Sequence, residues 1–161
     1  MEGFLTSNPR HSPAYLKQHT MTNERFNLEK SVLLRYLPAN TFVFKDISTS
    51  QPYILMAAKT NRGNVYTLRI DLDGFPNSLP HAFVTRMLKT RSGANMDGAS
   101  SSMHTLPSEY GYTRICHYGS NSWNPNVSLY KVYIKCRLWL EMYELHLQTG
   151  KTMDYYLNHQ S

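Results

Sequence analysis

The sequence predicts an α+β domain in which one antiparallel sheet packs against helices. Apolar residues recur at helical spacing towards both ends of the chain, and short strand-like runs separated by turn residues lie between them. Short connections between consecutive strands favour an antiparallel meander. A chain of 161 residues can bury one core of this kind. We therefore expect a single domain at residues 21–161, preceded by a flexible arm at residues 1–20.

The first predicted helix begins near Thr22 or Asn23, either of which can cap it, and ends at Pro38. Its apolar residues fall at roughly helical spacing: Phe26, Leu28, Val32, Leu33 and Tyr36. This pattern is typical of a short amphipathic helix.

Four strand-like runs follow, at residues 41–44, 53–58, 64–72 and 81–88. The third run alternates polar and apolar residues, and the turn signal at residues 61–64 joins it to the second run as a hairpin. A proline-rich turn separates the third run from the fourth. Together these runs predict a four-stranded antiparallel meander.

Two less regular stretches and a long helix complete the expected domain. Residues 90–103 are small and polar, which predicts a flexible insertion, and residues 104–127 predict an irregular segment. Ser128 then caps the clearest helix of the sequence, and Gly150 ends it. Residues 153–157 predict a final helical turn. One apolar stripe follows the long helix: Leu129, Val132, Cys136, Trp139, Tyr143 and Leu147.

Composition narrows the function classes. The chain carries a net charge of +6, but its 17 Lys and Arg residues are spread along its length, so we do not expect a nucleic-acid partner. A basic nucleic-acid-binding domain stays an alternative. The sequence lacks a membrane-spanning apolar run, a signal peptide, metal-ligand spacings and nucleotide-binding glycine patterns. We expect a cytoplasmic protein without a membrane association, a metal or a cofactor.

The two cysteines lie in different settings. Cys136 falls on the apolar stripe of the long helix, where a cysteine behaves as a small hydrophobic residue. Cys116 lies in the irregular segment, between glycines. From composition alone, two interpretations of Cys116 remain: a loop cysteine without a role, or a nucleophile. A cysteine protease would need a base oriented by a third group, and no flanking pattern indicates one.

The sequence around Cys116 contains a series of short motifs in a fixed order. They are a proline-rich turn Phe75-Pro76-Asn77-Ser78-Leu79-Pro80, then His104, then Ile115-Cys116, then Trp123-Asn124-Pro125, and then a helix that Ser128 opens. In this order and spacing, residues 75–132 resemble the core of the ubiquitin-conjugating enzyme family. The expected order of helix, strands, irregular segment and long helix is also that family's order.

The resemblance implies a fold like that of the ubiquitin-conjugating enzymes, with an N-terminal helix, a four-stranded meander, an irregular catalytic segment and a long C-terminal helix. It implies that Cys116 is a nucleophile that forms a thioester with a protein C-terminal carboxylate and passes the acyl group to a lysine amine on a target protein. A free thiol is only slightly ionised at neutral pH, which suits a carrier whose thioester must persist until the amine arrives.

The chain departs from the family at one catalytic position. His104-Thr105-Leu106 stands where the family has His-Pro-Asn, so the asparagine that supports the oxyanion is missing. Asn121, Asn124, His104 or backbone N–H groups are the candidates to replace it, and His104 is favoured among them. The alternative for His104 is a structural role inside the loop. Trp123 and Pro125 are expected to support the site. A catalytically inactive binding module of the same fold is therefore the main alternative.

This replacement, the enlarged loop at residues 90–103 and the short stretch after the long helix resemble the bacterial members of the family more than the eukaryotic ones. Many of the bacterial members lie in antiphage operons, including the cyclic-oligonucleotide signalling (CBASS) systems. The resemblance then implies a ubiquitin-like protein or the C-terminus of the system's nucleotidyltransferase (CD-NTase) as the donor. An activating enzyme is a further implied partner, and whether it is a separate protein stays open.

Overall fold

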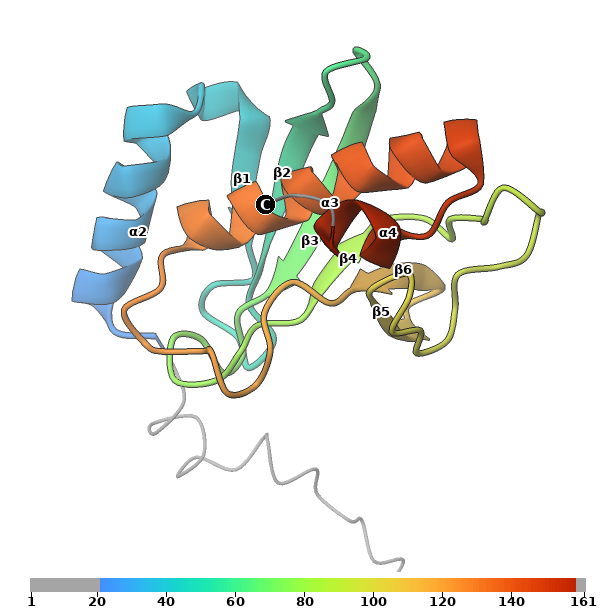
Figure 1. The fold of residues 1–161 in the computed structure, drawn as a ribbon. Coiled ribbons are helices and arrows are strands. Elements are labelled where there is room, and N and C mark those ends of the chain that lie inside the picture. Colours follow the sequence, from blue (N-terminus) through green and yellow to red (C-terminus); the bar gives the residue numbers. More distant parts are fainter. Residues whose placement is uncertain (1–20, 159–161) are drawn as a thin grey trace, which may run out of the picture.

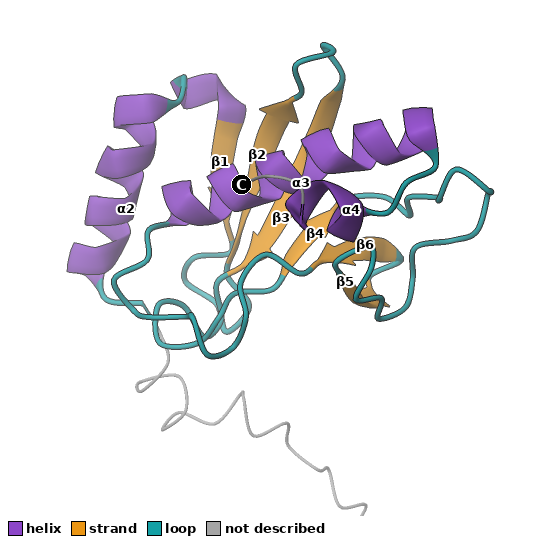
Figure 2. Cartoon of the chain, in the orientation of Figure 1, coloured by secondary structure: helices purple, strands orange, loops and turns teal. Residues whose placement is uncertain are grey.

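The computed structural model describes residues 21–158, and the expected arm at residues 1–20 lies outside them. An antiparallel sheet forms the centre of this part of the chain, and α3 (Leu129–Thr149) lies across one face of it with α4 (Met153–Asn158) beside it (Figure 1). Helix α2 (Asn23–Tyr36) stands next to the β1 edge of the sheet (Figure 2). The predicted α+β class is confirmed.

The sheet has six strands in the order β1-β2-β3-β4-β6-β5, and all neighbours are antiparallel. The first four follow the chain order, and a hairpin of β5 and β6 extends the sheet beyond β4. The strands and the short 3₁₀ turn are η2 (Ala39–Thr41), β1 (Phe42–Lys45), β2 (Tyr53–Lys59), β3 (Val65–Asp71), β4 (Ala82–Val84), β5 (Thr105–Glu109) and β6 (Tyr112–Ile115).

The prediction of four strands was wrong, because the β5–β6 hairpin lies in the segment that we expected to be irregular. Strand β5 contains Pro107 and several polar residues, so it shows no apolar alternation. It forms the edge of the sheet, where a proline does not interrupt an inner ladder. Fewer inward-facing apolar residues are needed there, and the sequence signal is correspondingly weak.

The core lies between the sheet and α3. Alternate residues of the inner strands point towards the helix and are fully buried, among them Ile54, Leu68 and Ile70. Trp139 is the largest buried side chain from α3, and Cys136 is fully buried one turn before it. The interpretation of Cys136 as a core residue is therefore confirmed. Within residues 21–158, none of the helices combines the length and apolarity needed to cross a bilayer.

Both long helices begin and end at their expected caps. The Thr22 hydroxyl accepts a hydrogen bond from the N–H of Arg25 at 3.1 Å, and the Ser128 hydroxyl accepts one from Lys131 at 3.1 Å. Gly150 ends α3 with a φ of 75°, a left-handed conformation that glycine adopts without steric cost.

A buried ion pair joins α2 to the start of α3. Glu29 is 2% exposed, and one of its carboxylate oxygens accepts the Nε–H of Arg25 at 2.8 Å. Its other oxygen accepts the backbone N–H of Leu129 at 2.8 Å, in the first turn of α3. A carboxylate at this point satisfies a helix N–H group and interacts favourably with the helix dipole.

Side chains of α3 form hydrogen bonds with backbone groups of the predicted insertion at residues 90–103 and of Lys89, directly before it. The Tyr143 hydroxyl donates to the Lys89 carbonyl at 2.8 Å, and the N–H of Arg91 donates to His146 Nε2 at 3.1 Å. Met96 and Met103 are buried within or beside this segment. Its flexibility stays a prediction.

We expect Glu29→Ala to lower the free energy of unfolding by about 3 kcal/mol, because it removes one partner of a buried ion pair and leaves the Leu129 N–H without an acceptor. Urea unfolding measures the loss. The matched control is Glu24→Ala, an exposed residue of the same helix, which should change stability by less than about 0.5 kcal/mol. Equal effects of the two substitutions would contradict this account.

Candidate functional site

Cys116 directly follows the last residue of β6 and is partly exposed. Its backbone N–H donates to the His104 carbonyl at 2.9 Å, which continues the register that pairs Thr105 with Ile115. One backbone hydrogen bond therefore places His104 opposite Cys116, directly beyond the last pair of the β5–β6 ladder. The structure brings these two predicted site residues together.

His104 is held at both its backbone and its ring. Its carbonyl accepts a hydrogen bond from Trp139 Nε1 at 3.0 Å, in addition to the one from Cys116. Its Nε2 lies 2.6 Å from the Asp154 Oδ1 of α4. Its φ is 52°, a left-handed conformation that non-glycine residues adopt only when their surroundings impose it. These contacts together fix the residue opposite Cys116.

Asp154 is the residue that the sequence interpretation missed. The final helical turn was expected, but nothing in the local pattern showed that it would face a histidine 50 residues earlier in the chain. An acidic residue shortly after a helix end is common, so its type alone carries little signal. The contact depends on how α4 folds back, which periodicity does not reveal.

Trp123 connects the loop before α3 to the proline-rich turn at residues 75–80 by a hydrogen bond and by ring contacts. Its Nε1 donates to the Pro76 carbonyl at 3.0 Å, and its ring centroid lies 6.1 Å from that of Phe75 and 5.7 Å from that of Tyr118. Two of the motifs singled out in the sequence, residues 75–80 and 123–125, are thus in direct contact.

Asn121, Asn124 and Pro125 lie in the exposed loop that leads to α3. The Asn124 side-chain oxygen accepts the N–H of Asn126 at 2.7 Å, and the Pro125 carbonyl accepts an Arg25 guanidinium N–H at 2.6 Å. Within the part of the chain that is described, neither asparagine hydrogen-bonds to Cys116. The structure does not place either of them as an oxyanion donor beside the thiol.

His117, the next residue after Cys116, is a neutral imidazole at pH 7. Burial of the ring is the largest cause that lowers its pKa to about 4, and interactions with Arg114, His81 and Lys135 contribute to that value in the same direction. Its buried Nε2 has no hydrogen-bond partner within residues 21–158. His117 therefore supplies no positive charge that would stabilise a thiolate at Cys116.

The two thiols differ in accessibility as the sequence suggested. Burial raises the pKa of the Cys136 thiol to about 12, so this sulfur stays protonated and is closed to reagents. Cys116 is the accessible thiol. Among the described residues, no hydrogen bond joins the Cys116 sulfur to the ring of His104 or His117.

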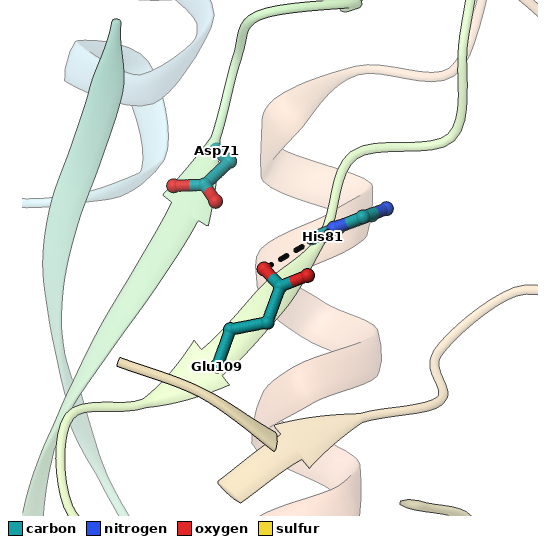
Figure 3. A group of neighbouring side chains, drawn as sticks. All are labelled: Asp71, His81 and Glu109. Carbon is teal, nitrogen blue, oxygen red and sulfur yellow. Dashed lines mark ion pairs between the residues drawn. The ribbon is translucent and has the colours of Figure 1, made fainter. Parts of the chain in front are cut away.

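A second group of polar side chains consists of Asp71, His81 and Glu109 (Figure 3). One potential metal-ligand atom from each lies within 4.8 Å of the others. Asp71, however, already accepts from Arg69 Nε and the Tyr110 hydroxyl, both at 2.8 Å. Because a guanidinium compensates this carboxylate, we interpret the group as part of an ion-pair network and assign no metal to it.

Comparison of the chain with protein-family models, with curated proteins and with solved structures finds no match. The resemblance to ubiquitin-conjugating enzymes therefore rests on the sequence motifs. The geometry adds a partly exposed thiol, an opposing histidine and an aspartate that binds that histidine.

The neutral, buried state of His117 predicts acid sensitivity. The unfolded chain takes up a proton on this residue near pH 6.5, whereas the folded chain does so only near pH 4. Above pH 6.5 the neutral His117 therefore costs no stability. As the pH drops from 6.5 towards 4, this residue lowers the free energy of unfolding by at most about 3 kcal/mol. Urea unfolding of wild type and His117→Gln at several pH values measures the difference in slope. Identical slopes would refute the assignment.

Proposed function

We propose that this chain is an acyl carrier like the ubiquitin-conjugating enzymes, with Cys116 as its thioester-forming nucleophile. One observation carries the proposal: Cys116 is an accessible thiol at a strand end opposite His104, while the other thiol, Cys136, is sealed in the core. A nucleophile must be reachable by a large substrate, and only the first thiol is.

The order of the elements is compatible with the proposal. A helix, four strands in chain order, the added β5–β6 hairpin, Cys116 and a long helix follow one another, and the hairpin is the element that the resemblance does not imply. The hydrogen bond from Trp123 to Pro76 also joins two of the motifs on which the resemblance depends.

The proposed reaction has two steps. The Cys116 thiolate attacks an activated acyl group at the C-terminus of the donor protein, a C–S bond forms, and the activating group leaves. A lysine amine then attacks the thioester carbonyl, a C–N bond forms, the C–S bond breaks, and the amine loses a proton. The second step needs a proton acceptor and a donor for the oxyanion.

The partners in this proposal are those that the sequence resemblance implies. The donor is a ubiquitin-like protein or the CD-NTase C-terminus of an antiphage system, and the acceptor is a lysine of a target protein. The donor carboxylate must arrive activated, which requires an activating enzyme upstream. We include bacterial antiphage defence in the proposal on the strength of the sequence resemblance.

One observation favours the alternative, a catalytically inactive binding module. The family's asparagine is absent, and Asn121 and Asn124 lie in an exposed loop without a contact to Cys116. Such a module would bind its partner without forming a covalent bond. The experiment that tests the proposal separates the two functions.

We expect Cys116→Lys, co-expressed with the donor and its activating enzyme, to accumulate a stable isopeptide at position 116, because an amide does not exchange with thiols. Cys116→Ser should accumulate an ester in the same way, and wild type a thioester that dithiothreitol removes. Intact-mass spectrometry measures all three adducts.

The matched control is Cys136→Ala, which removes the other thiol and should leave the wild-type adduct unchanged. If the adduct persists at wild-type level in a Cys116→Ala variant, a residue other than Cys116 is the nucleophile. Binding of the donor without any adduct in all variants would favour the inactive module.

A further inference from the structure

A carboxylate from α4 reaches the histidine that lies opposite Cys116. Asp154 Oδ1 lies 2.6 Å from His104 Nε2, and the two side chains remain 44% and 30% exposed. Both members of the pair are thus partly accessible from solvent. No part of the function proposed above uses Asp154.

The fold holds Asp154 in place through its neighbours. Met153, directly before it, is fully buried in the core. The N–H of Asp154 donates to the Ser102 carbonyl at 3.1 Å, in the segment that leads into His104. His146 Nδ1 lies 2.8 Å from the Lys151 carbonyl, which fixes the short connection between α3 and α4. The carboxylate is therefore anchored independently of its contact with His104.

The geometry points to an Asp154–His104 pair that accepts the proton of the incoming lysine amine, with Asp154 as the positioning residue. This inference rests on the proposed function. A carboxylate bound to Nε2 keeps the ring proton on that nitrogen, so Nδ1 carries the free lone pair. Within residues 21–158, His104 Nδ1 forms no hydrogen bond that would block it.

The resting thiol leaves room for this role. No hydrogen bond of the described residues joins the Cys116 sulfur to the His104 ring, and in the proposed transfer the acyl carbon and the attacking amine lie between them. As the C–N bond forms, the proton of the amine passes to Nδ1, and the C–S bond breaks to release the Cys116 thiolate. The imidazolium that results is stabilised by the Asp154 carboxylate and then returns its proton to the thiolate or to water.

The test uses the full chain and a synthetic peptide thioester that acylates Cys116 by thiol exchange, so no activating enzyme is required. Free lysine is then added, and loss of the Cys116 thioester is followed by intact-mass spectrometry as a function of pH. We expect Asp154→Asn to acylate at the wild-type rate but to lose its acyl group to lysine roughly ten- to hundredfold more slowly, with an altered pH profile.

Further variants separate positioning from folding. Asp154→Glu keeps the carboxylate and should restore part of the rate. In a His104→Gln background, Asp154→Asn should cause no additional loss, because Asp154 acts only through that ring. Asp97→Asn is the matched control, since Asp97 is an exposed aspartate of the segment before His104 and should leave both rates unchanged.

Two results would overturn the inference. If Asp154→Asn aminolyses at the wild-type rate, the pair has no part in transfer, and the proposed function stands without it. If acylation and aminolysis fall together, with a lower melting temperature and no rescue by glutamate, Asp154 is only structural. A wild type that forms no thioester at Cys116 would refute the proposed function and this inference together.

Discussion

The buried Glu29 carboxylate joins helix α2 to the first turn of helix α3. It accepts a backbone N–H from the first turn of α3, and it accepts Arg25, whose guanidinium also donates to two carbonyls of the loop before that helix. A buried ion pair contributes favourably only when its remaining donors and acceptors are satisfied, and here both carboxylate oxygens have partners. The pair thereby anchors the first turn of α3, together with the Ser128 cap, on the helix that also contacts the segment before Cys116.

Helix α3 transmits this position to the site through three side chains one turn apart. Trp139 binds the carbonyls of Met103 and His104, Tyr143 binds the Lys89 carbonyl, and His146 accepts the N–H of Arg91. Each contact satisfies a backbone group of the segment between β4 and β5, which has little regular structure of its own. The conformation of His104 is therefore imposed from the helix side, and this explains how a non-glycine residue keeps a positive φ beside Cys116.

Local periodicity predicted the elements whose signals are local. The caps at Thr22, Ser128 and Gly150, the core position of Cys136 and the early strands all follow from spacing within a few residues. The β5–β6 hairpin did not follow, because an edge strand that contains a proline needs no apolar alternation. The partners of Glu29 and His104 lie 100 and 50 residues away, and no pattern within one element indicates such contacts. The sequence could name Cys116 and His104, but their opposition on one ladder required the fold.

The absence of a hydrogen bond between the Cys116 sulfur and either neighbouring histidine ring bears on the choice between a carrier and a hydrolase. A cysteine protease activates its thiol through a histidine that takes the thiol proton, and a third group orients that histidine. Here Asp154 orients His104, but within residues 21–158 neither the His104 ring nor the neutral His117 ring hydrogen-bonds to the Cys116 sulfur. A carrier has the opposite requirement, because its thioester must survive until an amine arrives. In the proposed carrier, a base held near the acyl group but not bonded to the resting thiol would assist the amine without activating the free thiol. The Asp154–His104 pair is the candidate for that base.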